Sequence, residues 1–62
     1  MSKYLIKIKN SEFTIPKENI VMLALMKAMD LKVNGIPLKT EEQAIAFLES
    51  LGMEISEASD EL

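Results

Sequence analysis

The side chains of this sequence that come closest to catalytic chemistry are its carboxylates. The chain has no His and no Cys, which removes the most common general base, the thiol nucleophile and the main ligands of soft metals. Glu42 and Glu49 are seven positions apart, so a helix would turn both to the same side, about 10 Å apart along its axis. Surface carboxylates of this kind usually contact only solvent. The sequence therefore predicts a protein that is not an enzyme.

Phosphate, metal and cofactor sites also lack their usual sequence patterns. Gly35 and Gly52 are the only glycines, so the chain has no glycine-rich loop that could hold a phosphate. Residues 56–62 are acidic, but they lack the spaced ligands and the turn glycine of a calcium loop. We therefore expect no cofactor and no bound metal.

The charges of the chain are separated along its length. All seven cations are lysines within residues 1–39, whereas residues 40–62 carry seven carboxylates and no cation. Without arginine, the chain lacks the planar side chain that grips phosphate and guanine at two points. An acidic surface on the C-terminal part would attract a basic protein surface and repel nucleic acid. Glu42, Glu49 and Glu54 are the candidate contacts to such a protein partner.

The lysines leave an alternative function open. Lys3, Lys7 and Lys9 would share one face of an N-terminal strand and could follow a nucleic-acid backbone. The nearby aromatic residues Tyr4 and Phe13 would lie on the opposite face, away from any bases that the lysines attract. Lysines on a strand also discourage pairing with other chains. Nucleic-acid binding therefore ranks below protein binding.

The N-terminal part of the chain has the pattern of a β-hairpin. Residues 3–9 and 12–15 alternate apolar and polar side chains, which is typical of half-buried strands. A two-residue turn at Asn10-Ser11 would join them and pair Ile6 with Ile15 on the apolar face. The sequence therefore predicts a hairpin with that register.

The segment from Pro16 to Asp30 is expected to form a helix that is apolar on more than one side. Its apolar side chains cover roughly 240° of the circumference, against the roughly 100° that a surface helix needs. A chain this short buries only about 60% of its surface, and here no disulfide or metal adds stability. We therefore expect a homodimer or a higher oligomer. The candidate interface residues are Val21, Met22, Leu25, Met26 and Met29.

The next segment carries a turn signal and a helix signal. Asn34-Gly35 between apolar residues predicts a tight hairpin, although Pro37 limits it to a short ribbon or a plain turn. Thr40 and Gln43 form a capping box before an amphipathic helix over residues 41–51. We expect Gly52 to end that helix.

The C-terminal residues are expected to contribute little to the fold. Residues 53–55 could add a short strand, and residues 56–62 have the polar, acidic composition of a mobile tail. The sequence therefore predicts a single domain over residues 1–55.

Together these elements predict a small α+β protein with the order β-hairpin, apolar helix, Asn-Gly hairpin or turn, and second amphipathic helix (ββα-ββ-α). The longest apolar run, Ile20–Met26, is seven residues long, against the roughly 20 that cross a membrane, and no signal-peptide pattern is present. We therefore expect a cytoplasmic protein without membrane contact. Small acidic proteins without catalytic side chains, including those of phages, are often inhibitors or regulators, and this is the function class that we expect.

Overall fold

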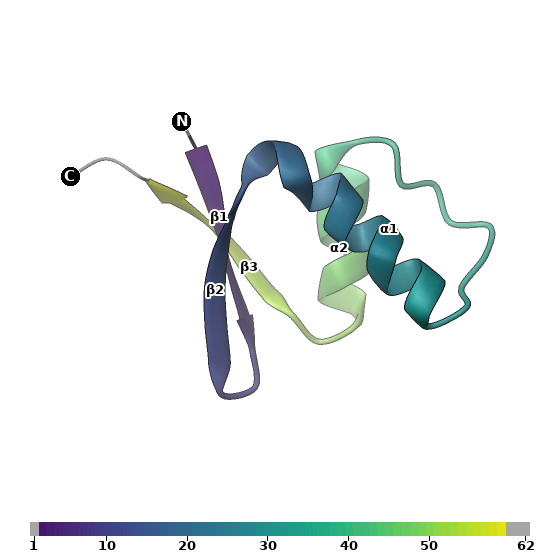
Figure 1. Ribbon diagram of the computed structural model, residues 1–62, viewed down its shortest axis with the longest axis horizontal. Coiled ribbons are helices and arrows are strands. Elements are labelled where there is room, and N and C mark those ends of the chain that lie inside the picture. The colour runs from purple at the N-terminus through teal and green to yellow at the C-terminus, as the bar shows by residue number, and fades with distance from the viewer. Residues whose placement is uncertain (1, 60–62) are drawn as a thin grey trace.

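The computed structural model describes residues 2–59 of the chain. They form a three-stranded antiparallel sheet and two α-helices, which confirms the α+β class (Figure 1). In chain order the elements are β1 (Ser2–Ile8), β2 (Ser11–Pro16), the 3₁₀ turn η1 (Lys17–Asn19), α1 (Ile20–Asp30), α2 (Glu41–Ser50) and β3 (Glu54–Ser59). The strand order is β2-β1-β3, so β1 is the central strand.

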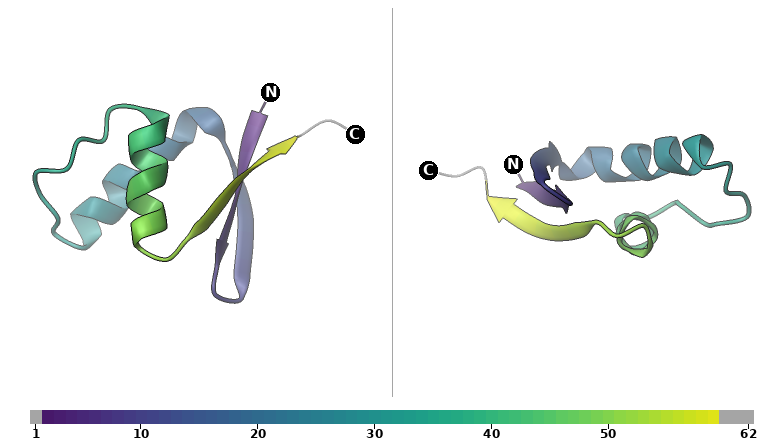
Figure 2. Two further views of the ribbon diagram at one scale, coloured as in Figure 1. Left: turned by 180° about the vertical axis from the view of Figure 1, so that it is seen from behind. Right: turned by 90° about the horizontal axis from the view of Figure 1, so that it is seen from below.

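The molecule is elongated and thin, with extents of 39 × 26 × 15 Å. The sheet lies at one end and the two helices lie at the other (Figure 1). Seen from below, α2 is viewed along its axis while α1 lies lengthwise, so the two helices cross each other (Figure 2). The same view shows α2 on one side of α1 and no element of the described chain on the other.

The core joins the inner face of the sheet to the facing sides of the two helices. Its largest fully buried side chains are Ile6 of β1, Ile20 of α1 and Leu48 of α2. Small side chains lie where α1 packs on α2, which allows a close approach of the helix axes. The buried apolar residues are Tyr4, Ile6, Ile20, Ala24, Ala28, Leu38, Ala44, Phe47, Leu48 and Met53.

The N-terminal hairpin forms as expected, but its predicted register is wrong by two residues. The turn is at Lys9-Asn10, and Ile6 lies opposite Phe13 instead of Ile15. Lys9 has a φ of 52°, the positive value that a two-residue hairpin turn needs to match the twist of its strands. Because the shift is even, every side chain keeps its predicted face of the sheet. The turn geometry, and not the apolar pattern, therefore decides the register.

The third strand extends beyond the short segment suggested by the sequence. β3 pairs antiparallel with β1 from Lys7 opposite Glu54 to Ser2 opposite Ser59. The segment expected to be an acidic tail thus continues the strand for four residues past Ile55. Residues 60–62 of that tail lie outside the described residues.

The helix of residues 16–30 begins later than expected. Pro16 closes β2 with an extended backbone (φ −59°, ψ 145°), and η1 leads from it into α1 at Ile20. The helix ends at Asp30, as predicted. Pro16 fixes φ without fixing ψ, so it is compatible with the end of a strand as well as with the start of a helix.

At Asn34-Gly35 the sequence left a hairpin or a plain turn open, and the hairpin is wrong, because residues 31–40 contain no strand. The chain bends at Gly35 without a backbone hydrogen bond across the bend. Gly35 adopts a positive φ of 81° within an open loop. Pro37 cannot donate a ladder hydrogen bond, and Leu38 is buried in the core instead of pairing with Leu31. Burial of Leu38 therefore outweighs the local turn signal.

The second helix confirms its predicted capping signals. Thr40 accepts a hydrogen bond from the backbone N–H of Gln43 at 3.2 Å, and the Gln43 side chain accepts one from the N–H of Thr40 at 3.2 Å. At the other end, Gly52 has a φ of 98° and donates to the carbonyl of Glu49, as in the Schellman motif. The local sequence thus sets both ends of α2.

Candidate functional site

The most prominent surface feature is an apolar face on α1 that points away from the core. Met22, Leu25, Met26 and Met29 are 61%, 46%, 57% and 76% exposed. Their spacing places them on one stripe of the helix, opposite the buried Ile20, Ala24 and Ala28. We call these four residues the outer α1 face.

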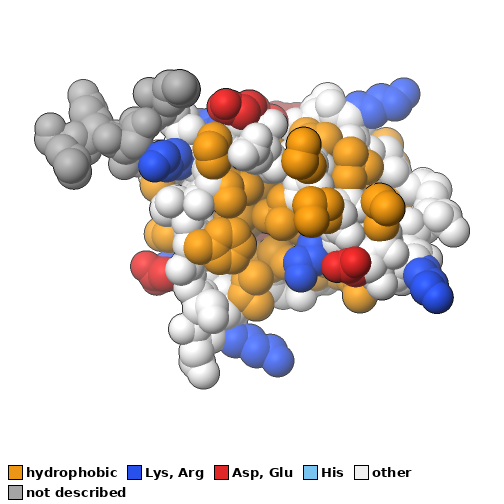
Figure 3. Space-filling view, viewed as in Figure 1, with side chains coloured by type: hydrophobic (Ala, Val, Ile, Leu, Met, Phe, Trp, Pro, Cys, Tyr) orange, Lys and Arg blue, Asp and Glu red, His pale blue; other side chains and the backbone are white. Residues whose placement is uncertain are grey.

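The space-filling view shows hydrophobic side chains gathered over α1 and the adjoining part of β2 (Figure 3). This is the side of α1 that faces away from α2. The predicted apolar arc is thus divided into a side covered by the core and a side that the described chain leaves open. Of the predicted interface residues, only Val21 is not on the outer α1 face, because it is half-buried against the core.

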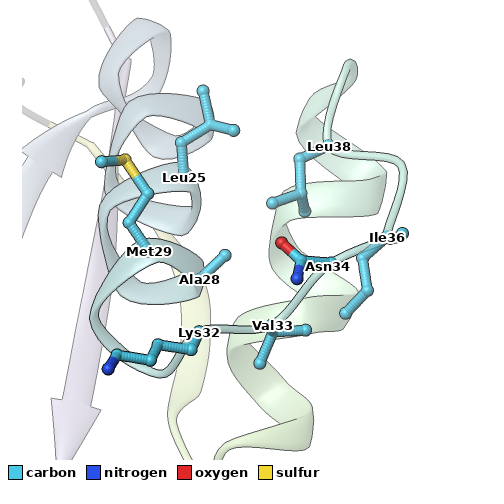
Figure 4. A pocket seen from close by; sticks show the side chains of 9 residues that line it. Leu25, Ala28, Met29, Lys32, Val33, Asn34, Ile36 and Leu38 are labelled. Atoms are coloured by element: carbon cyan, nitrogen blue, oxygen red, sulfur yellow. The ribbon is translucent and has the colours of Figure 1, made fainter.

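A groove continues the outer α1 face on one flank. It has a volume of about 590 Å³ and lies between the C-terminal half of α1 and the loop of residues 32–38. Leu25, Ala28 and Met29 form the helix side of the groove, and Leu38 and Asn34 lie across from them (Figure 4). Sequence reasoning missed this groove, because a paired hairpin would have filled the same space with strand.

The three acidic candidate contacts do not lie on one element. Glu42 and Glu49 are exposed on α2, seven positions apart and therefore on nearly the same side of the helix. Glu54 is the first residue of β3 and lies opposite Lys7 in the sheet. The structure thus keeps Glu42 and Glu49 on one side of α2 and places Glu54 beside Lys7.

The three lysines of the alternative interface are also separated. Lys3 and Lys7 are on the sheet face opposite the core residues Tyr4 and Ile6, whereas Lys9 is in the turn after β1. The register places Glu12 on one side of Lys7 and Glu54 on the other. Carboxylates at these positions reduce the positive potential around Lys7.

A polar cluster that the sequence does not reveal connects β1 to three other elements. The Tyr4 hydroxyl donates to Glu41 Oε1 of α2 at 2.8 Å. Lys17 Nζ lies 5.1 Å from the centre of the Tyr4 ring and 2.9 Å from Glu57 Oε1 of β3. Burial, the hydrogen bond to Glu41 and the charges of Glu41 and Glu57 raise the pKa of Tyr4 to about 12. Tyr4 therefore stays protonated and acts as a donor that holds α2 against the sheet.

This cluster makes the stability of the protein sensitive to high pH. The pKa of Tyr4 is about 12 in the folded state against 10.0 as its ordinary value, so its contribution to stability is complete below pH 10 and is lost as the pH rises through 12. We therefore expect the free energy of unfolding to fall as the pH rises from 10 to 12. Since Tyr4 is the only tyrosine, the ultraviolet absorbance of tyrosinate follows it directly. Tyr4→Phe is the control, and an equal loss of stability in this variant would contradict the assignment.

Within residues 2–59, no three acidic side chains come close enough together to hold a metal ion. No helix in the described part of the chain is long and apolar enough to cross a membrane. The buried polar side chains of this part all have hydrogen-bond partners.

No known protein family matches the sequence, and comparisons with curated proteins and with solved structures gave no significant match. The outer α1 face, its groove and the acidic side of α2 are therefore the basis for a functional proposal.

Proposed function

We propose that this protein is a non-enzymatic interaction module. It forms a homodimer through the outer α1 face and binds a basic surface of a protein partner, as an inhibitor or regulator does. The observation that carries the proposal is the exposure of four large apolar side chains on a single helix face. Contiguous apolar patches of this kind mark interaction sites on soluble domains.

The chemistry of the outer α1 face supports a role in binding. Each Å² of apolar surface removed from water contributes roughly 25 cal/mol, and Met22, Met26 and Met29 are all more than half exposed. Methionine side chains are flexible and polarisable, so they adapt to a facing surface. Covering this face therefore stabilises a complex without any change in the core.

The acidic side of α2 supports a basic partner. Glu42 and Glu49 project from the exposed side of the helix, and the C-terminal part of the sequence has no cation to neutralise them. Charges of one sign on a surface increase the rate of encounter with a surface of the opposite sign. A phosphate backbone would be repelled by the same side of the molecule.

Dimerisation is tested with one charge placed on the outer α1 face. Met26→Glu should give a folded monomer, because Met26 is 57% exposed in the single chain but its charge would be unpaired in a dimer. Ala46→Glu on the exposed side of α2 is the matched control and should stay dimeric. Sedimentation over about 1–300 µM covers the range of weak to moderate interfaces, and circular dichroism checks the fold. A wild-type monomer at every concentration would contradict the homodimer.

The basic partner is tested through association rates. Affinity capture from the native cell identifies the candidate partner. The association rate constant of the two purified proteins is then measured at several salt concentrations. We expect the reversal of Glu42 and Glu49 to Lys to slow association about tenfold at low salt and to flatten the salt dependence. Reversal of Glu12 on β2 changes the total charge as much as Glu42→Lys or Glu49→Lys alone, so it is the control for these two single variants. Equal rates for the Glu12 variant and the single α2 variants would contradict the assignment to α2.

The alternative function, binding of nucleic acid through Lys3, Lys7 and Lys9, makes the opposite prediction. Affinity for DNA or RNA would then fall steeply with salt and would be lost when the three lysines are neutralised. Glu12 and Glu54 beside Lys7 are the reason for preferring a protein partner. A salt titration with both nucleic acids distinguishes the two functions.

A further inference from the structure

The outer α1 face is bounded at its two ends by opposite charges. Glu18, in η1, is exposed and lies four positions before Met22. Lys32 is exposed just after the end of α1, and its side chain runs along the side of the helix end that carries Met29 (Figure 4). From one end to the other, the stripe reads acidic, apolar and basic.

Such a stripe is complementary to itself only when two copies run in opposite directions. If the two-fold axis passes between Leu25 and Met26, then Met22 of one copy faces Met29 of the other, and Glu18 lies within one position of Lys32. A parallel arrangement would instead bring Glu18 next to Glu18 and Lys32 next to Lys32, which is unfavourable, and would align the two helix dipoles. The charge pattern therefore selects the antiparallel pair.

The groove offers a place for a side chain of the second copy. Leu25, Ala28 and Met29 line it from the helix, and Lys32 lines it from just after the helix end. A hollow between helix side chains three and four positions apart is what receives a knob in helix packing. Ile36 of the loop, which is 40% exposed, closes the far side. In the antiparallel pair, Met22 of the second copy lies opposite this hole. A flexible methionine fills an irregular hole well.

Lys32 also occupies an unusual backbone position. It has a φ of 57°, and its N–H donates to the carbonyl of Met29 while that of Val33 donates to Ala28. This is the position after a helix end where glycine is the usual residue, because a Cβ atom disfavours the left-handed conformation. Lys32 thus occupies a backbone position at which glycine would make the isolated subunit more stable.

We propose that two copies of this chain pair α1 against α1 in antiparallel orientation, with Met22 of each copy inserted into the groove of the other and Glu18 paired with Lys32. This arrangement rests on the proposed homodimer and specifies its interface. It contains the Met22 and Glu18–Lys32 contacts twice, because the pair has two-fold symmetry.

Cysteine cross-linking tests the orientation, since the chain has no cysteine of its own. Met22→Cys and Met29→Cys are purified separately, and each is oxidised alone and in an equal mixture. The antiparallel pair predicts a disulfide between the two variants in the mixture and little product from either one alone. A parallel pair predicts the reverse. Ala46→Cys on α2 measures the background.

Charge variants test the contacts at the two ends. Glu18→Lys and Lys32→Glu should each weaken the dimer about tenfold, and the double variant should restore it. Lys32→Gly should also weaken the dimer while it stabilises the isolated subunit. Lys9→Gly is the matched control, because it removes a lysine with a φ of 52° from a turn outside this interface, and it should leave the dissociation constant unchanged.

The outcomes separate this arrangement from the dimer itself. If wild-type protein sediments as a monomer, both the homodimer and its interface are wrong. If it is a dimer but Met22→Cys and Met29→Cys each cross-link alone, or if the double charge variant does not recover, the antiparallel arrangement is wrong and the homodimer stands.

Discussion

Replacing Ile6 with alanine is expected to remove most of the stability of the folded chain. Ile6 is fully buried on the central strand and lies between Phe13 of β2 and Ile55 of β3. Truncation of a buried isoleucine to alanine costs about 2–5 kcal/mol. A domain of 62 residues has a total stability of roughly 3–9 kcal/mol, so the expected loss is a large part of the whole.

Thermal and urea unfolding followed by circular dichroism measure this loss. All variants are compared at one protein concentration, because the stability of an oligomer depends on concentration. Leu5→Ala is the matched control, since Leu5 is the preceding residue on the opposite, partly exposed face of the same strand, and it should lose less than half as much. Ile6→Val should lose about 0.5–1.5 kcal/mol. Near-wild-type unfolding of the Ile6→Ala variant would show that the inner face of β1 is not the centre of the core.

The elements that could be predicted from the sequence are those whose signals are local. Thr40 and Gln43 contact each other across one helical turn, and Gly52 supplies its own positive φ. These interactions need no distant partner, so the limits of α2 follow from residues 40–52 alone. The predicted end of α1 at Asp30 is also confirmed.

The errors lie where a distant contact outweighs a local preference. Asn34-Gly35 is a strong hairpin signal, yet Leu38 gains more by burial between the helices than by pairing in a two-stranded ribbon. The length of β3 depends on its pairing with β1, from Ser2 to Lys7, almost the whole chain away in sequence. No local pattern in residues 56–59 indicates that one edge of β1 is free to pair with them.

The sequence predicted only part of the candidate site, and the rest was missed because it too depends on distant contacts. The excess of apolar residues on α1 indicated an uncovered face, but periodicity does not say which part of the arc the core would occupy. The structure assigns that part to Ile20, Ala24 and Ala28. The groove depends on the course of the loop after α1, and the Tyr4–Glu41 contact joins residues 37 positions apart. Both features require the fold to be known.

The geometry of the fold explains why one side of α1 stays open. Along its shortest direction the backbone extends 15 Å, which is the span of two packed helix layers. The view from below shows that α2 covers α1 from one side only (Figure 2). A chain of this length has no further element within residues 2–59 that could cover the other side.

Removing the C-terminal residues after Ile55 is expected to destabilise the protein strongly. The truncation deletes the part of β3 from Ser56 to Ser59, which pairs with β1 from Leu5 to Ser2. It also deletes Glu57, the ion-pair partner of Lys17, and exposes one side of the buried Tyr4. The lost backbone hydrogen bonds contribute about 1 kcal/mol each. In a domain of this size, 1 kcal/mol corresponds to a shift of about 4–8 °C, so the melting temperature should fall by ten degrees or more.

Two control variants distinguish the contribution of the β3 backbone pairing to stability from the contributions of the Glu57 side chain and of the residues after Ser59. Truncation after Ser59 retains every pair between β3 and β1 and should keep the melting temperature of the full chain. Glu57→Gln removes only the ion pair with Lys17, in which the Glu57 side chain is 76% exposed, so its effect should be below about 1 kcal/mol. If truncation after Ile55 leaves the melting temperature unchanged, residues 56–59 add nothing to stability and the domain ends at Ile55. A large fall in melting temperature after truncation at Ile55, with no such fall after truncation at Ser59, would show that β3 completes the sheet that holds α1 and α2.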